Sequence, residues 1–362
     1  GIWPESPSFR DEGIGKIPSK WKGVCMEGHD FKKSNCNRKL IGARYYGKKD
    51  AKAGSPRDFN GHGSHTASTA AGVIVNNASY YGLAKGIARG GSPSSRIAAY
   101  KACTEKGCSG GTLLKAIDDA IKDGVDIISI SIGFSSEFLS EYLSDPIAIG
   151  AFHAEQRGVM VVCSAGNDGP DHYTVVNTAP WIFTVAASNI DRNFQSTVVL
   201  GNGKSFKGTG INFSNLTGST MYSLVFGEEV AAKFTSKTEA RKPTATILPT
   251  TEVHRYRPAP IVASFSSRGP SSLTENILKP DVMAPGVSIL AALIPKKENV
   301  PIGKKPSMFG LKSGTSMACP HVSGAAAFIK SVHRSWSPSM IKSALMTSDT
   351  DTCGYMQSLL FP

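Results

Sequence analysis

Short apolar runs alternate with helical stripes along the middle of the chain. Three runs predict strands: residues 96–103 (RIAAYKAC), 125–133 (VDIISISIG) and 159–167 (VMVVCSAGN). The second run is almost continuously apolar, which is typical of a strand buried on both faces. Between them, residues 111–124 carry apolar side chains at helical spacing up to Gly124, and residues 146–158 predict a second helix. Strands that alternate with helices form a parallel sheet covered on both faces, so the pattern predicts an α/β fold.

The pattern continues in the last third of the chain. Residues 181–188 (WIFTVAAS) and 287–293 (VSILAAL) predict strands, and two helices follow. The first helix begins near Ser316, and the second has Ser337 as its N-cap with Pro338 at the first helical position. Residues 200–260 break the rhythm because they are rich in Gly, Ser, Thr and Asn, which predicts a peripheral or incomplete insertion.

Composition narrows the possible partners. The chain has 362 residues, 40% of them hydrophobic, which is enough to bury a core. No apolar run reaches the ~18–20 residues that a membrane span needs, so we expect no membrane partner. The formal net charge is +12, but the basic residues are scattered and no nucleic-acid-binding motif accompanies them. We therefore expect a basic protein surface and no nucleic-acid partner.

Cysteines and sequons favour an oxidising, secretory environment. Two cysteine pairs are close in sequence within polar stretches: Cys25 with Cys36, and Cys103 with Cys108. They fit short local disulfides, with a metal site as the alternative, while Cys163 and Cys319 are expected to be buried thiols and Cys353 is left over. Three Asn-x-Ser/Thr sequons are glycosylation candidates: Asn77, Asn212 and Asn215. We expect no signal peptide within the residues of this sequence.

The strongest chemical signal is the segment SGTSMACPHVSG (313–324). Ser316 opens an apolar, Gly- and Ala-rich helix, which places its hydroxyl at the positive end of the helix dipole. The backbone N–H of Ser316 could then donate to a developing oxyanion. Pro320 is expected to lie early enough in the helix to do little harm. The segment thus indicates a nucleophile, and an ordinary N-cap serine is the alternative.

Two histidines lie three residues apart in NGHGSHTASTAAG (60–72). A serine nucleophile needs a His as general base, and His62 or His65 could serve. The pair could instead share a metal ion, although Asp58 is the single further ligand nearby. A histidine satisfied within the core is the third possibility.

An asparagine follows a predicted strand in VVCSAGNDGP (161–170). The amide of Asn167 could donate to a tetrahedral oxyanion, because open α/β sheets bind ligands beyond the carboxyl ends of their strands. A turn asparagine before Asp168 and Gly169 is the alternative.

Taken together, the three segments resemble the subtilisin-like serine proteases, and among them the plant subtilases, in the order of that family's His, oxyanion and Ser motifs. The segments DGVDIISISIG, PAPIVASFSSRGPS and LKPDVMAPGVSILAA are also similar to the family. The resemblance covers most of residues 1–212 and 243–348. It implies a three-layer subtilisin-like fold, with a mainly parallel sheet between helices, and a secreted, extracellular endopeptidase made with a pro-region.

The resemblance also implies roles for single residues. Ser316 would be the nucleophile, His62 the general base and Asn167 the oxyanion donor, with His65 structural. Two strand ends would hold an extended peptide or protein substrate by backbone pairing: Ser131, Ile132 and Gly133, and Ser164, Ala165 and Gly166. The pairs Cys25/Cys36 and Cys103/Cys108 match disulfide positions of the plant members, and neither a cofactor nor a metal is expected.

The sequence departs from the family at three places. The family's catalytic Asp would stand two residues before Gly1, together with the first central strand of the sheet, and Asp11 does not match that motif. We expect one peptidase domain over 1–348, in which 216–250 are the remnant of a protease-associated insertion. Residues 349–362 form a divergent tail. The competing hypotheses are a catalytically impaired or inactive relative that binds peptides, and a metal-binding protein that uses His62 and His65.

Overall fold

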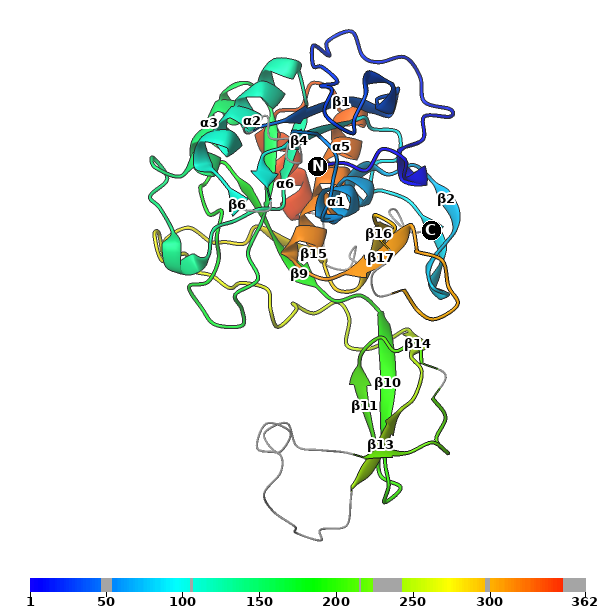
Figure 1. Cartoon of the computed structure of the whole chain (residues 1–362). Coiled ribbons are helices and arrows are strands. Elements are labelled where there is room, and N and C mark those ends of the chain that lie inside the picture. Colours follow the sequence, from blue (N-terminus) through cyan, green and yellow to red (C-terminus); the bar gives the residue numbers. More distant parts are fainter. Residues whose placement is uncertain (47–53, 105–106, 215, 224–242, 297–299, 348–362) are drawn as a thin grey trace. The chain divides into compact units, whose positions relative to one another are not determined.

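The computed structural model describes residues 1–46, 54–104, 107–214, 216–223, 243–296 and 300–347 (Figure 1). The chain divides into two compact units. The first comprises Gly1–Ile190, Pro260–Lys297 and Pro306–Pro362, and the second comprises Asp191–Ala259 and Glu298–Lys305. The peptidase domain over 1–348 and the remnant at 216–250 stay predictions, and the tail 349–362 lies outside the described residues.

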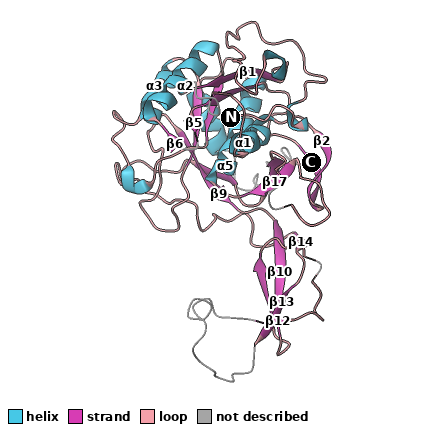
Figure 2. Cartoon of the chain, viewed as in Figure 1, coloured by secondary structure: helices cyan, strands magenta, loops and turns pink. Residues whose placement is uncertain are grey.

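The first unit contains the helices and all the parallel strands (Figure 2). Its helices are α1 (His62–Ala71), α2 (Gly110–Asp123), α3 (Pro146–Gln156), α5 (Thr315–Val332) and α6 (Pro338–Thr347), with short 3-10 turns η1 (Pro7–Phe9), η2 (Lys33–Asn35) and η3 (Ser136–Phe138). Its strands are β1 (Leu40–Tyr45), β2 (Val75–Tyr80), β3 (Leu83–Ala88), β4 (Ile97–Lys101), β5 (Cys103–Thr104), β6 (Gly107–Cys108), β7 (Ile127–Ile130), β8 (Met160–Ser164), β9 (Phe183–Ser188), β15 (Val282–Pro285), β16 (Ile289–Ala292) and β17 (Phe309–Lys312).

Four of these strands form a parallel sheet in the order β15-β9-β8-β7. All five residues of β8 are buried, and alternate side chains of a strand point to opposite faces. Val161 and Cys163 pack with residues of α2 and α3, whereas Met160 and Val162 pack with residues of α5 and α6. Helices therefore cover both faces of the sheet, and the predicted three-layer α/β fold is confirmed.

The prediction that residues 125–133 form a strand buried on both faces is wrong. In β7, Ile130 is buried, Ile127 and Ile128 are half-buried, and Ser129 is exposed. Within the described residues, β7 pairs with β8 alone, and β4 pairs with β1 in a separate parallel sheet.

Helices α1 and α5 pack closely against each other in the first unit. A Cβ atom at Gly324 would lie 2.6 Å from the carbonyl oxygen of Ala70 and 2.8 Å from Cα of Gly91. Only a glycine allows the two backbones to approach so closely. This contact fixes α5 against α1, and with it the position of the N-terminal turn of α5.

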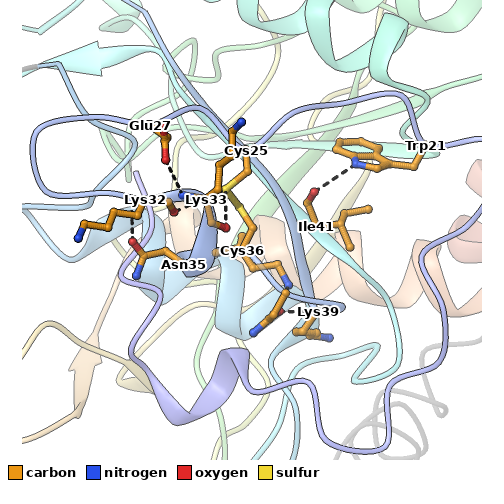
Figure 3. The surroundings of a disulfide bond; sticks show 11 residues. Trp21, Cys25, Glu27, Lys32, Lys33, Asn35, Cys36, Lys39 and Ile41 are labelled. Atoms are coloured by element: carbon orange, nitrogen blue, oxygen red, sulfur yellow. Dashed lines mark hydrogen bonds between the residues drawn. A yellow bond between two sulfur atoms is a disulfide. The ribbon is translucent and has the colours of Figure 1, made fainter.

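Two disulfides tie loops of the first unit, and they match the cysteine pairs expected from the sequence. Cys25 bonds to Cys36 and Cys103 bonds to Cys108. Around the first, Asn35 accepts from the backbone N–H of Lys32 and Glu27 accepts from that of Lys33 (Figure 3). The expected buried thiols, Cys163 and Cys319, are buried and unbonded to other cysteines, while Cys353 lies outside the described residues.

The second unit is built from antiparallel strands: β10 (Arg192–Leu200), β11 (Ser205–Thr209), β12 (Tyr222–Ser223), β13 (Thr244–Ile247) and β14 (Thr251–His254). β10 pairs with β11, β13 and β14. In the described part of the chain, no helix is both long and apolar enough to cross a lipid bilayer.

Candidate active site

Ser316 is the second residue of α5 and the one partly exposed residue between Gly314 and Ala326. Gly314 directly precedes the helix with φ 148°, a conformation that favours glycine, and its N–H donates to Gly286 O at 2.8 Å. The Ser316 N–H has no acceptor among the described residues, as is usual for the first turn of a helix. Ser316 therefore presents both a hydroxyl and a backbone donor at a helix N-terminus.

Asn167 lies next to this turn and is held there by Thr315. The Asn167 Oδ1 atom accepts from the backbone N–H of Thr315 at 2.9 Å and from its Oγ1 at 3.0 Å. Two donors on one oxygen fix the orientation of the carboxamide and leave Nδ2 as its free donor. Asn167 is exposed, so its Nδ2 is accessible to a ligand.

His62 is the first residue of α1 and follows Gly61, whose φ is 90°. The His62 ring is half-buried and forms no hydrogen bond with the described residues. Burial, followed by the charge of Lys312, lowers the pKa of His62, while the charge of Asp58 opposes this shift. The ring is thus neutral at neutral pH, which is the state that a general base requires.

His65 lies on the same helix in a very different environment. It is fully buried, and its Nε2 donates to Ile289 O at 3.0 Å and to Gly310 O at 3.2 Å. Burial lowers the pKa of His65 to about 3. Among the described residues, no three His, Cys, Asp or Glu side chains gather into a possible metal-binding group.

The two carboxylates considered from the sequence, Asp58 and Asp11, have other partners. Asp58 accepts from the N–H of Ser64 at 2.8 Å, from its Oγ at 2.7 Å, and from the N–H of Gly61 at 2.9 Å, so it orders the turn into α1. Asp11 accepts from Arg38 Nε at 2.9 Å. Neither carboxylate forms a hydrogen bond with His62.

The two expected peptide-binding segments differ in how their backbone groups are used. In residues 164–166, every carbonyl has an internal donor: Ser164 O from Asn177, Ala165 O from Val176, and Gly166 O from Ser267. In residues 131–133, Ile132 O accepts from Asn177, while Ser131 O has a single contact, from Ser316 Oγ at 3.4 Å. Gly133 is exposed. Among the described residues, carbonyls without a backbone or amide donor are therefore found on 131–133 rather than on 164–166.

Asn177 is a residue of this site that the sequence interpretation missed. The β7–β8 ladder ends at Ile130 and Cys163, and beyond it Asn177 Nδ2 donates to Ile132 O at 3.0 Å and to Ser164 O at 2.8 Å. Asn177 is buried and has φ 56°, a conformation that asparagine tolerates better than most residues. An Asn within a Val- and Ala-rich loop gives no sequence signal for such a bridge.

The sequons are not equivalent in the structure. Asn77 is exposed on β2. Asn212 uses its side-chain nitrogen to donate to Ile247 O at 3.0 Å and to Leu248 O at 3.3 Å. Asn215 lies outside the described residues.

Comparisons with known proteins agree with the motifs. A family model described as the subtilase family matches residues 16–360. The CO(2)-response secreted protease of Arabidopsis thaliana is 47% identical over 436 residues, which cover 97% of this chain and 57% of that protein. The subtilisin-like protease SBT5.1 of the same plant is 44% identical over 438 residues, with 96% and 56% covered.

Among solved structures, sphericase is similar with a TM-score of 0.47 and 25% identity, over 81% of this chain and 70% of that one. The chain spans just over half the length of the curated relatives that it matches.

Proposed function

This chain belongs to the subtilase family, and we propose that it hydrolyses peptide bonds as a serine endopeptidase. The observation that carries the proposal is the grouping at the start of α5. There, the partly exposed hydroxyl of Ser316, the free N–H of Ser316 and the free amide donor of Asn167 lie together. Helix α5, whose first turn bears Ser316, packs against α1, which begins at His62.

In the proposed reaction, Ser316 Oγ attacks the carbonyl carbon of the scissile peptide bond while His62 takes the hydroxyl proton. Negative charge then develops on the former carbonyl oxygen, where the Ser316 N–H and Asn167 Nδ2 would donate to it. His62 returns the proton to the leaving amine, and water releases the acyl group by the same steps in reverse. Both donors are already oriented, so little reorganisation is needed when the charge forms.

A serine protease of this type also needs a carboxylate that orients its histidine. We propose that this is the Asp which the family places two residues before the position of Gly1. The packing of Gly1 supports this, because a Cβ atom on Gly63 would lie 2.1 Å from Gly1 O. Residues that directly precede Gly1 would thus be close to the start of α1, where His62 lies.

The proposed substrate is an extended segment of a peptide or protein. Ile132 O accepts from Asn177, and an extended course of the chain beyond β7 would turn the carbonyls of Ser131 and Gly133 to the opposite side. A substrate strand could pair with these two residues by β-augmentation. Ser164, Ala165 and Gly166 would form the facing wall, since their carbonyls are already bonded.

The remaining proposals concern the protein's surroundings. Two disulfides and an exposed sequon at Asn77 support a secreted, extracellular glycoprotein. By family resemblance, we propose synthesis with a pro-region and catalysis without a cofactor or metal.

Reaction with a biotinylated fluorophosphonate tests the proposal, because this reagent reacts covalently with an activated serine. For the folded protein with the residues that precede Gly1, including the proposed Asp, we expect labelling at Ser316 and no labelling of Ser316→Ala. Ser313→Ala is the matched control, since Ser313 lies three residues before Ser316 and donates no group to the site. A folded chain that stays unlabelled would contradict the proposal.

A second candidate is a relative that binds peptides without cleaving them. The observation that favours it is the His62 ring, which bonds neither to Ser316 nor to a carboxylate of the described residues. Such a protein would bind a substrate peptide equally well with Ser316→Ala and would never release product. Turnover of the peptide by the unmodified chain would exclude this candidate.

A further inference from the structure

Pro320 lies deeper in α5 than the sequence suggested. The helix begins at Thr315, so Pro320 is its sixth residue, and the side chain of Pro320 is buried. In an α-helix the N–H of each residue donates to the carbonyl four residues earlier, so the missing N–H of Pro320 would have donated to Ser316 O. The helix itself therefore leaves the carbonyl of Ser316 without its usual donor.

Ser131, the residue directly after β7, supplies that donor. Its Oγ donates to Ser316 O at 2.9 Å, while Ser316 Oγ donates weakly to Ser131 O at 3.4 Å. The two serines are 185 positions apart in the sequence and contact each other through both their hydroxyls and their carbonyls. A buried or half-buried carbonyl without a donor is destabilising, so the contact with Ser131 replaces the lost helix bond.

We propose that Ser131 is a positioning residue, whose hydroxyl holds the Ser316 backbone in place through the carbonyl that Pro320 leaves free. This inference rests on the proposed function of Ser316 as nucleophile. It adds to the backbone role expected for Ser131 toward substrate, because it concerns the side chain. The consequence is that the strand which binds substrate and the turn which bears the nucleophile are fixed to each other by one hydrogen bond.

A second serine shows that the contact is specific to the first turn. Ser129 lies in β7, two residues before Ser131, and its side chain also contacts α5. It contacts Cys319 Sγ at 3.7 Å and accepts from Ser323 Oγ at 2.8 Å. Both serines therefore link the strand to α5, but only Ser131 contacts Ser316, and Ser129 is the matched control.

The test is a double-mutant cycle on Ser131 and Pro320. Pro320→Ala restores a backbone N–H that can donate to Ser316 O, so it should make the hydroxyl of Ser131 dispensable. We would measure the rate of fluorophosphonate labelling for the unmodified chain, Ser131→Ala, Pro320→Ala and the double variant, with Ser129→Ala as control. Thermal unfolding of each variant shows whether it is folded.

We expect Ser131→Ala to slow labelling roughly tenfold, the factor that corresponds to the loss of about one hydrogen bond. In the Pro320→Ala background the same substitution should slow labelling less than about twofold, and Ser129→Ala should leave the rate unchanged. With a peptide substrate, Ser131→Ala should lower kcat with little change in KM, as a defect in nucleophile position rather than in binding.

Two outcomes would overturn the inference, and a third separates it from the proposed function. If Ser131→Ala slows labelling by the same factor with and without Pro320, the shared carbonyl is not the cause. If Ser129→Ala is labelled as slowly as Ser131→Ala, the loss of rate comes from packing of β7 against α5 and not from the Ser131 hydrogen bond. If the folded, unmodified chain is not labelled at all, the proposed function fails and the positioning role fails with it.

Discussion

The carboxamide oxygen of Asn167 accepts from both the backbone N–H and the hydroxyl of Thr315. Thr315 directly precedes Ser316, so the residue that would stabilise the oxyanion is oriented by the neighbour of the nucleophile. The two groups would otherwise depend on separate parts of the chain, one after β8 and one at the start of α5.

Asn167→Ala should slow fluorophosphonate labelling and peptide hydrolysis by ~10²–10³, the usual effect of removing one oxyanion donor. Thr315→Val keeps the backbone N–H and removes only the hydroxyl, so we expect a much smaller loss, of about tenfold or less. Rates for the two variants, measured beside the unmodified chain, check this order. Equal losses would show that Asn167 acts by holding the turn rather than by donating to the oxyanion.

Asn177 should affect substrate binding more than the chemical step. Asn177→Gly keeps the positive φ and removes both donors to Ile132 O and Ser164 O. We expect KM for a peptide to rise roughly tenfold, because the strand ends that flank the substrate lose their bridge, with a smaller change in kcat. Asn177→Ala should be less stable than Asn177→Gly, since only glycine adopts this φ without strain. A normal KM in the glycine variant would refute the role.

Much of this arrangement could be predicted from the sequence, for identifiable reasons. Strands such as β8 and helices such as α2 have strong periodic patterns, and Ser316, His62 and Asn167 lie in motifs. The exposure of Ser129 could not be predicted, because it depends on which strand lies beside β7. The partners of Asn177 and of the Ser316 carbonyl are distant in the sequence, so only the folded chain brings them together.

Charge near His62 should set the pH dependence of labelling. Burial and then the charge of Lys312 lower the pKa of His62 below 6.5, the ordinary pKa of histidine. The ring therefore stays neutral to a lower pH than an exposed histidine would. Lys312→Gln removes a positive charge, which makes protonation of the ring easier and raises its pKa. We therefore expect the acid limb of the labelling rate to move to higher pH. Lys85→Gln, on β3, changes the net charge equally and should leave the limb in place.

Two buried histidines should make the fold sensitive to acid. Burial lowers the pKa of His65 to about 3 and that of His321 to about 4, from 6.5. At a pH between the lowered pKa and 6.5, the histidine is protonated in the unfolded chain and neutral in the folded one. The free energy of unfolding therefore decreases as the pH falls below 6.5. At about pH 5 each ring should contribute a loss of about 2 kcal/mol.

Thermal unfolding from about pH 7 to about pH 5 measures this effect. His65→Gln does not titrate and retains an N–H donor for the carbonyls of Ile289 and Gly310. Its melting temperature should therefore depend less on pH than that of the unmodified chain. An unchanged slope would mean that His65 is not the group responsible.

The close approach of α1 and α5 also limits how the sequence of this chain can vary. A Cβ atom at Gly324 would lie 2.6 Å from the carbonyl oxygen of Ala70, so even the smallest other side chain would push the two helices apart. His62 begins α1 and Ser316 lies in the first turn of α5. A substitution at Gly324 would therefore change the distance between the proposed base and the proposed nucleophile without touching either side chain.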